Sequence, residues 1–549
     1  MSKNTPKSDT SLDRRSVLRG AGALALTALV PVTTGTALAE PPHAQGRPRP
    51  LRKSNRVRDA YKYRVKMAKM AAQRPLFENV SNGDEDNLEH FVGNYSKALP
   101  HDSLGHVDPA AYAALVKASH SGKNNDFDQV PLGLGRKLTS AQAALAFELQ
   151  GCDSHHSYMP PAPAFSSAEE AAEMVELYWM SLCRDVPFTE YATNPLTQAA
   201  MAEIGALPDY RGARAGDGLV TPPVLFRGLE YGCSVGPYLS QFLWQDVPYG
   251  AQVISQRSQT VLPGIDYLTD VDSWLAVQNG ADPRGTDIVD PVRRYPRDLR
   301  GMGRWVQIDA LYQAYLNACL ILLGQKAPFA AGIPSTQSVT CEGFVDWGAP
   351  HLMALVCEVS TRALKAVWYH KWNVHRRLRP EEFGGRVHNH LAGRSSYPIH
   401  ESVLNSQAVS QVFSQYGTYL LPMAFPEGSP THCSYGSGHA TVAGACTTIL
   451  KAWFKEDHAL AHPVVPNADG TALEPWEGDP LTVGNELNKV AANIGIARNG
   501  AGVHWLSDYY QSLRLGEYVA KTVLEEQKPS YNQSPTFEFT SFDGHHVTI

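Results

Sequence analysis

Three short segments of the sequence combine basic, hydroxyl and imidazole side chains at spacings that suit the binding of an oxyanion. The first, ALKAVWYHKWNVHRRLRPEEFGG, contains Lys371 and, eight positions later, Arg379. On a helix Lys371 lies seven residues after Leu364, so its ammonium leaves an apolar stripe. An unpaired buried charge costs several kcal/mol, so such an ammonium requires a partner or an anion. The alternative is a lysine that extends to solvent beside a surface basic pair, Arg376 and Arg377.

The second segment, HCSYGSGHATVAGAC, places Ser437, Gly438 and His439 directly before residues that favour a helix. A helix N-terminus presents unsatisfied N–H groups and a positive dipole, which together bind anions. Gly438 permits close approach of the backbone. An ordinary N-capping serine in a glycine-containing loop explains the same residues. The segment matches neither the Gly-x-Ser-x-Gly nucleophile motif nor a phosphate-binding P-loop.

The third segment, ARNGAGVHWLSD, contains Arg498, which follows Ile494 by four residues and so leaves an apolar helix face. His504 and Asp508 are four residues apart. If a helix begins near His504, the carboxylate holds one ring nitrogen and leaves the other to bond an electrophile. A purely structural arginine and histidine are the alternative for this segment alone. Together, the three segments predict one cradle for a tetrahedral or trigonal-bipyramidal oxyanion.

Helical periodicity dominates the sequence around these segments. Apolar residues recur with the period of a helix in nine stretches: 56–73, 110–122, 140–151, 166–185, 305–324, 349–372, 439–454, 484–500 and 507–527. Alternating strand patterns are scarce, and residues 263–304, rich in Pro, Gly, Asp and Arg, are predicted to be irregular. We therefore predict an all-α fold: a large helical bundle domain with long irregular connections and few short strands. Residues 40–300 should form a mainly helical N-terminal region, and residues 301–549 a helical region that carries the site.

The first 39 residues are predicted to be a secretion signal. They contain the pair Arg14 and Arg15, an apolar run over residues 20–32, and the small-x-small triplet at 37–39. The run is too short to span about 30 Å of hydrocarbon. The pattern is typical of a bacterial twin-arginine signal cleaved before Glu40, with a chance basic and apolar leader as the alternative. We therefore expect a periplasmic or secreted protein without a membrane span.

Composition excludes some functions and leaves others open. The chain has 549 residues, 43% of them hydrophobic and 19% charged, and a formal net charge of -6. This balance gives no basic footprint for nucleic acid, so we expect no nucleic-acid partner. The eight cysteines are scattered without C-x-x-C or zinc-type spacing. We expect mostly core thiols, with one or two disulfides left open.

The motifs Lys-x7-Arg-Pro, Ser-Gly-His and Arg-x5-His-x3-Asp, in this order, resemble those of the vanadium-dependent haloperoxidases, which share their site with the type 2 phosphatidic acid phosphatases. The segments KWNVHRRLRPEEFGG, HCSYGSGHAT and NYSKALPHDSLGHVDP look most like the algal bromoperoxidase subgroup and its bacterial relatives. The resemblance covers about residues 55–525. It implies an enzyme that oxidises bromide, with chloride and iodide as further candidates, by hydrogen peroxide. The product, a hypohalous acid equivalent, would halogenate small organic acceptors.

The resemblance also implies a vanadate cofactor and a role for each motif residue. The residues that would bind the vanadate oxygens are Lys371, Arg379, Ser437, Gly438 and Arg498. His504 would bind vanadium, with Asp508 as the carboxylate that orients it. His439 would be the acid–base residue, and Lys371 would polarise the peroxide bond.

His432 and Trp368 would tune the halide preference. Algal bromoperoxidases usually carry arginine where this chain has Trp368, and an indole offers an apolar wall and a positive ring edge without a formal charge. The acidic loop through which some algal relatives bind calcium has no counterpart in PSTQSVTCEG, so no calcium site is predicted. By the same resemblance we expect a homo-oligomer.

Two other functions remain open at this point. An exported acid phosphatase would use the same pocket, with His504 as the nucleophile and His439 protonating the leaving group, because five-coordinate vanadate resembles the transition state of phosphoryl transfer. A non-catalytic oxyanion-binding protein is the third class, and it would not need both histidines.

Overall fold

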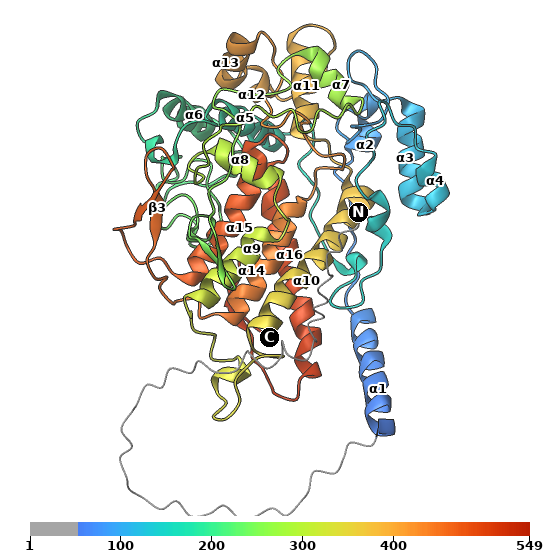
Figure 1. Ribbon diagram of the computed structural model, residues 1–549. Coiled ribbons are helices and arrows are strands. Elements are labelled where there is room, and N and C mark those ends of the chain that lie inside the picture. The colour runs from blue at the N-terminus through green and yellow to red at the C-terminus, as the bar shows by residue number, and fades with distance from the viewer. Residues whose placement is uncertain (1–52) are drawn as a thin grey trace, which may run out of the picture. The chain divides into compact units, whose positions relative to one another are not determined.

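Figure 1 shows the computed structural model of the chain, which describes residues 53–549. The predicted secretion signal, residues 1–39, lies outside the described residues. The contacts divide the chain after Ala60, and the site lies entirely within Tyr61–Ile549.

Helices make up most of the regular structure of residues 53–549. The first eight are α1 Lys53–Ala72, α2 Asp84–Asn87, α3 Pro109–Ser121, α4 Asn124–Asp128, α5 Ala168–Leu182, α6 Pro195–Ala206, α7 Val271–Gln278 and α8 Leu299–Gln307. The other eight are α9 Gln313–Gly324, α10 Ala349–Tyr369, α11 Pro380–Leu391, α12 Glu401–Leu404, α13 Gln407–Tyr416, α14 Gly438–Trp453, α15 Val483–Gly500 and α16 Leu506–Gln527. Shorter helical turns include η3 Ala141–Leu145 and the π-helical turn η8 His370–His375.

The strands described in residues 53–549 are each three residues long and form three antiparallel pairs. They are β1 Val247–Tyr249 with β2 Gln252–Ile254, β3 Val464–Pro466 with β4 Leu473–Pro475, and β5 Glu538–Thr540 with β6 His546–Thr548. The all-α prediction, with long irregular connections and few short strands, is confirmed. No helix among these residues is both long and apolar enough to cross a bilayer.

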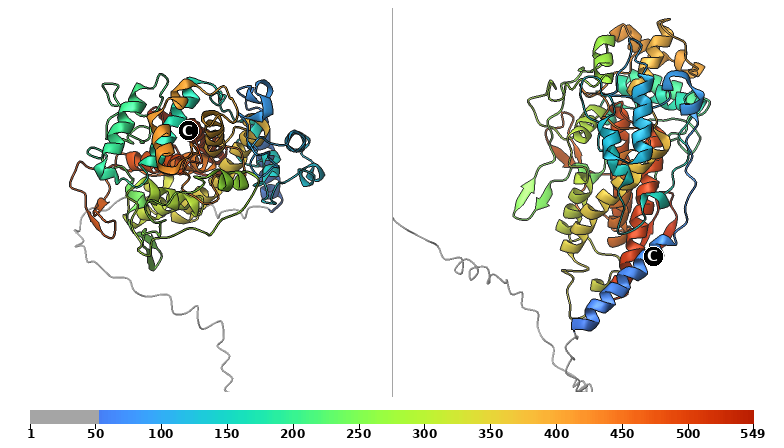
Figure 2. Two further views of the ribbon diagram at one scale, coloured as in Figure 1. Left: turned by 90° about the horizontal axis from the view of Figure 1, so that it is seen from above. Right: turned by 90° about the vertical axis from the view of Figure 1, so that its right-hand side faces the viewer.

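Four helices of the C-terminal half form the centre of the bundle. Helix α14 packs against α10, α15 and α16, and Figure 1 shows these helices side by side. The right-hand view in Figure 2 again shows orange and red helices of this group side by side. Because α10, α14, α15 and α16 also carry or adjoin the three sequence motifs, the bundle brings the motifs to one end of α14.

Two glycines let α14 and α16 approach until their backbones touch. A Cβ atom on Gly444 would lie 2.1 Å from the carbonyl oxygen of Leu513, and one on Gly516 would lie 2.1 Å from that of Thr441. Real Cβ atoms do not approach a carbonyl oxygen so closely, so each position requires glycine. This close crossing places the first turn of α14 directly beside the first turns of α16.

Three sequence predictions differ from the structure. Residues 140–151 form only the short turn η3, because Phe147 and Leu149, the apolar residues that would continue the helix, are 80% and 94% exposed. The expected helix 305–324 is broken between α8 and α9, where Ile308 is 68% exposed. The stretch 263–304 was predicted to be irregular, but it contains α7, which Asp270 caps, and the start of α8, which Asp298 caps.

The cysteines behave as expected for core thiols. All eight lie in the part of the chain that the structure describes, and none forms a disulfide. Six are buried, Cys357 is half-buried and Cys341 is exposed. The disulfides that the sequence left open are therefore absent from residues 53–549.

Candidate active site

Lys371 lies in the π-helical turn η8 that follows α10, and its side chain is fully buried. Its Nζ donates to the carbonyl oxygens of Cys433 at 2.7 Å and Ser434 at 2.9 Å. No acidic side chain in residues 53–549 lies within ion-pair distance of it. Burial, and then the charge of Arg379, holds the pKa of Lys371 well below its usual range. The alternative of a lysine extended to solvent is wrong, and an anion bound beside this buried amine would favour its charged form.

Arg379 joins all three motifs. It precedes Pro380, the first residue of α11, and its guanidinium is fully buried. Nε donates to the carbonyl oxygen of His432 at 2.9 Å, and Nη2 lies 2.8 Å from Nδ1 of the same histidine. Nη1 donates to the carbonyl oxygen of Val503 at 2.7 Å and lies 2.9 Å from Nε2 of His504. The chain thus orders both histidines around one cation.

Ser437 caps α14, as the sequence suggested. Its Oγ accepts from the backbone N–H of Ala440 at 3.3 Å, and its own N–H donates to Oγ of Ser512 on α16 at 2.8 Å. Gly438 is the first helical residue, and a Cβ there would lie 3.2 Å from the ring of Trp368. The absence of a side chain at Gly438 keeps the helix N-terminus open on the side of Trp368.

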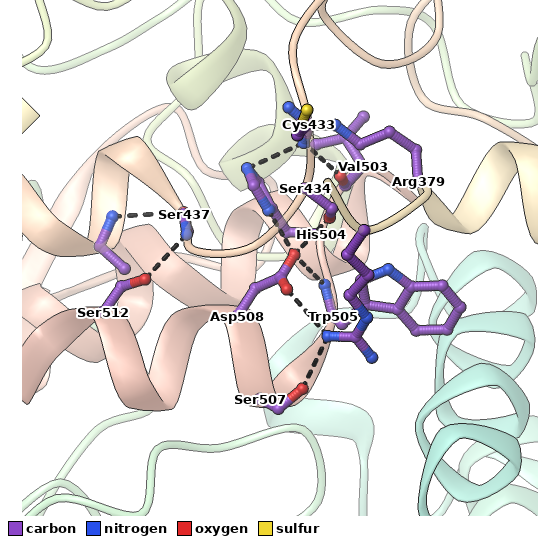
Figure 3. Close-up of polar contacts among 12 residues, drawn as sticks. Arg379, Cys433, Ser434, Ser437, Val503, His504, Trp505, Ser507, Asp508 and Ser512 are labelled. Carbon is purple, nitrogen blue, oxygen red and sulfur yellow. Dashed lines mark hydrogen bonds and ion pairs between the residues drawn. The ribbon is translucent and has the colours of Figure 1, made fainter. Parts of the chain in front are cut away.

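His504 is held by Asp508 in the geometry that the four-residue spacing predicts. Helix α16 begins at Leu506, and Nδ1 of His504 lies 2.7 Å from Oδ2 of Asp508 (Figure 3). Because Nδ1–H donates to the carboxylate and Nε2 accepts from Arg379, the ring is neutral with its lone pair on Nε2. Burial, and then Arg379 and Lys371, holds the pKa of His504 well below its usual range. A neutral imidazole with a fixed lone pair is the form that binds a metal.

The carboxylate of Asp508 has further partners that the sequence did not reveal. Oδ2 accepts from the backbone N–H of Trp505 at 3.2 Å and from the hydroxyl of Ser434, and Oδ1 accepts from Nη1 of Arg377 at 2.9 Å. The guanidinium of Arg377 also pairs with two glutamates of α5, Glu170 and, at 3.1 Å, Glu173.

The alternative in which Arg376 and Arg377 form a surface basic pair is therefore wrong. Arg377 is 2% exposed and Arg376 is 6% exposed, and Arg376 pairs with Glu85. One pattern could have indicated the role of Arg377. It stands two residues before Arg379 in an extended segment, so the two side chains leave the backbone on the same side.

His439, in the first turn of α14, is paired with an acidic residue that sequence reasoning missed. Its Nε2 lies 3.0 Å from Oδ1 of Asp309. Burial lowers the pKa of His439, and the carboxylate of Asp309 opposes that shift. Asp309 lies in the break between α8 and α9, which the sequence predicted to be one continuous helix, so no pattern placed it at the site.

Arg498 enters the site from the last turn of α15. Nη1 donates to the carbonyl oxygen of Val306 at 2.9 Å, while the buried Nε has no partner. Its guanidinium lies over the ring of Phe425, 5.6 Å from the centroid. Burial, and then the charge of Arg379, lowers the pKa of Arg498 to about 10. Arg498 makes no ion pair among the residues that the structure describes.

The three motifs meet at one cavity of about 220 Å³. The predicted site residues that line it are Trp368, His432, Gly438, His439, Arg498 and His504. Lys371, Arg379 and Ser437 lie directly behind this wall: Lys371 is 5.6 Å from the Trp368 ring centroid, Arg379 contacts both His432 and His504, and Ser437 precedes Gly438. The convergence that the sequence predicted is therefore present. These three residues contact or adjoin the residues that line the cavity but do not line it themselves.

Comparison with known proteins identifies the family of this site. The chain is 37% identical over 590 aligned positions to the vanadium-dependent bromoperoxidase of Corallina pilulifera, with 90% of this chain and 98% of the relative covered. The chain belongs to the family of the vanadium-dependent bromoperoxidases. The member from Ascophyllum nodosum is 34% identical, with 86% of this chain and 88% of that protein covered.

Two further findings agree with membership of the bromoperoxidase family. The homohexameric structure of the second vanadate-dependent bromoperoxidase of Ascophyllum nodosum superposes with a TM-score of 0.86 at 29% identity and covers 94% of each chain. A family profile described as the VCPO second helical-bundle domain matches residues 351–533. That range begins within α10 and ends just after α16, so it contains all three motifs.

Proposed function

We propose that this chain is a vanadate-dependent haloperoxidase that oxidises bromide with hydrogen peroxide to a hypohalous acid equivalent, which halogenates small organic acceptors. Chloride and iodide are its further candidate halides. The observation that carries the proposal is the convergence of three buried basic side chains, Lys371, Arg379 and Arg498, around His504, whose Nε2 lies 2.9 Å from Nη1 of Arg379. None of the three pairs with a carboxylate among the described residues.

The chemistry of these donors fits vanadate. Three cations without carboxylate partners favour a multiply charged anion, and the buried Nε–H of Arg498 has no acceptor of its own. Lys371, Arg379, Ser437, Gly438 and Arg498 would hold the vanadate oxygens, and His504 would bind vanadium through Nε2. The vanadate supplies a Lewis acid that activates peroxide while its oxidation state stays unchanged.

The residues around His439 are arranged to move a proton. Nε2–H of His439 donates to Asp309, so Nδ1 is the basic nitrogen. Because burial lowers the pKa of His439, the ring is neutral at neutral pH and can take a proton from hydrogen peroxide at Nδ1. The same atom returns that proton as water or hypohalous acid leaves. The buried ammonium of Lys371 stabilises negative charge that develops on oxygen.

Trp368 and His432 form the part of the wall that we assign to the halide. Their ring centroids are 4.8 Å apart, and Arg379 donates to Nδ1 of His432. Burial, and then Lys371 and Arg379, holds the pKa of His432 well below its usual range, so this ring is neutral. The indole adds an apolar surface and no formal charge. Bromide, which is easier to oxidise than chloride, remains the primary substrate, and chloride is the second.

One experiment separates this function from the alternatives. Apoprotein is titrated with orthovanadate and assayed for bromination of a phenol-sulfone dye with hydrogen peroxide, in parallel with hydrolysis of p-nitrophenyl phosphate. We expect bromination that depends on vanadate and saturates with it. Phosphate hydrolysis without vanadate, combined with no bromination at any vanadate concentration, would establish the acid phosphatase instead. Vanadate binding without either reaction would indicate a non-catalytic oxyanion-binding protein.

We also propose three features of the protein beyond its chemistry. Residues 301–549 form the region that carries the site, since every predicted vanadate-binding residue lies there. The protein is a homo-oligomer, as the homohexameric relative suggests. It is exported to the periplasm or secreted, for which the support is the twin-arginine pattern of residues 1–39.

A further inference from the structure

The active-site cavity contains a cation from a distant part of the chain that none of the sequence motifs includes. Arg136 lines the same cavity as Trp368 and His432. It is half-buried, and its Nη1 donates to the backbone oxygen of Glu427 at 3.3 Å. No acidic side chain in residues 53–549 lies within ion-pair distance of its guanidinium. A partly desolvated guanidinium without a carboxylate attracts an anion.

The segment that carries Arg136 is fastened to the halide wall by four hydrogen bonds. The backbone N–H of Thr139 donates to the carbonyl oxygen of Thr431 at 2.8 Å, and the two threonine hydroxyls lie 2.9 Å apart. The hydroxyl of Thr431 also donates to the carbonyl oxygen of Lys137 at 2.7 Å. The indole Nε1–H of Trp368 donates to the carbonyl oxygen of Thr139 at 3.2 Å. These bonds fix the segment of Arg136 against Trp368 and the residue that precedes His432.

We propose that Arg136 captures the halide at the mouth of the cavity and supplies the positive charge that Trp368 lacks. The inference rests on the proposed haloperoxidase function and names a specificity residue of that site. A guanidinium is weakly hydrated and presents a flat donor face. It therefore suits a large halide such as bromide or iodide, which then lies against the indole wall. The vanadate-binding residues stay one step deeper in the same cavity.

A carboxylate in the same cavity allows a test in which the expected effect on halide binding is the opposite of that for Arg136. Glu427 lines the cavity, and its carboxylate oxygens lie 3.3 Å from Nε2 of Gln307. No cation of the described residues lies within ion-pair distance of this carboxylate. A carboxylate without a cationic partner repels an entering anion. Removing the charge of Arg136 should weaken halide binding, and removing that of Glu427 should strengthen it.

The experiment compares three variants of the vanadate-loaded enzyme at constant ionic strength. We expect Arg136→Gln to raise the KM for bromide about five- to tenfold and to leave kcat within about twofold, because the residue acts on an anion before the reaction. Glu427→Gln should lower the same KM. Lys137→Gln, which removes an equal charge from an exposed neighbour outside the cavity, should change KM less than about twofold. An equal rise for Arg136→Gln and Lys137→Gln would overturn the proposal.

A second readout does not depend on turnover. Iodide quenches tryptophan fluorescence on contact, so the difference in quenching between wild-type apoprotein and Trp368→Phe reports iodide at the halide wall. We expect Arg136→Gln to reduce that difference at a given iodide concentration, because less iodide is then bound at the halide wall. The double variant Arg136→Gln with Trp368→Arg should regain a low KM for bromide, because it returns the charge to the wall.

The two levels of the proposal fail in different ways. A wild-type enzyme that binds vanadate and oxidises no halide would contradict the proposed function. A wild-type enzyme that oxidises bromide, together with an Arg136→Gln variant of unchanged KM and unchanged quenching, would contradict only the role of Arg136. The vanadate affinity of each apoprotein, measured by calorimetry, shows whether the variant retains its folded site.

Discussion

Arg377 and His504 bind opposite oxygens of the same carboxylate. Oδ1 of Asp508 accepts from Arg377 at 2.9 Å, and Oδ2 lies 2.7 Å from Nδ1 of His504. Figure 3 shows Oδ2 of Asp508 bonded to His504, to the hydroxyl of Ser434 and to the backbone N–H of Trp505. Because Arg377 is paired in turn with Glu170 and Glu173, α5 in the N-terminal half supports the residue that we assign to vanadium.

Loss of Arg377 should destabilise the protein strongly. Arg377→Gln leaves the buried carboxylates of Glu170, Glu173 and Asp508 without their cation, and an uncompensated buried charge costs about 3–5 kcal/mol in unfolding free energy. Urea denaturation followed by circular dichroism measures the change. Adding Glu170→Gln to the same variant should recover part of the loss, since it removes one orphaned charge. Independent, additive effects of the two substitutions would show that the pair is not coupled.

Asp508→Asn should weaken vanadate binding about ten- to a hundredfold, the usual effect of removing the partner of a metal-binding histidine. An amide can accept from Nδ1–H, but it lacks the negative charge that makes the ring a strong donor at Nε2. Titration of the apoprotein with orthovanadate by calorimetry measures the affinity directly. Ser507→Ala, which removes a neighbouring partner of Arg377 and leaves Asp508 in place, is the matched control. A vanadate affinity in Asp508→Asn equal to that of the control would contradict this role for Asp508.

The pH dependence of peroxide use should depend on Asp309. His439 must be neutral to take a proton, so kcat/KM for hydrogen peroxide should fall as the pH drops through the pKa of His439. Burial has lowered that pKa from its ordinary value, and Asp309 raises it again. Asp309→Asn removes the raising influence, so the acid limb should move to lower pH. A pH profile at saturating bromide tests the sign, and a shift to higher pH would exclude the assigned proton transfer.

The site residues could be predicted from the sequence because the geometry of each motif is determined by residues within that motif. A helix start after Ser437 and a four-residue spacing between His504 and Asp508 are properties of single segments, and the structure has both. The bundle also followed from apolar periodicity, since the central helices are buried along most of their length.

What the sequence could not predict are the partners that come from distant segments. Asp309 reaches His439 because a helix predicted to be continuous breaks at an exposed isoleucine, Ile308. Arg377 resembles a surface residue until α5 supplies two glutamates 204 and 207 positions away in the chain. Such contacts depend on tertiary packing, which overrides local propensity and produces no periodic pattern in the sequence.

Trp368 should determine how well the enzyme uses chloride. Trp368→Arg places a second cation beside Lys371 and removes the apolar wall against His432. We expect the ratio of kcat/KM for chloride to that for bromide to fall about tenfold or more, because the added guanidinium is weakly hydrated and favours the larger, more weakly hydrated bromide. Steady-state assays with each halide measure the ratio. Lys365→Arg, an exchange of like charges outside the cavity on the same helix, is the control, and an equal ratio in both variants would refute the assignment.

The close crossing of α14 and α16 should affect both the stability of the protein and its affinity for vanadate. Gly444→Ala would place a Cβ atom 2.1 Å from the carbonyl oxygen of Leu513, so the helices must separate, at about 1–3 kcal/mol or more in unfolding free energy. Because the N–H of Ser437 bonds to Ser512 across this crossing at 2.8 Å, the same separation should also weaken vanadate binding. Denaturation and vanadate titration measure the two effects. Gly216→Ala, where an added Cβ meets no atom within 4 Å, is the control and should change neither. A Gly444→Ala variant that loses stability but binds vanadate with full affinity would show that the cradle does not depend on the helix crossing.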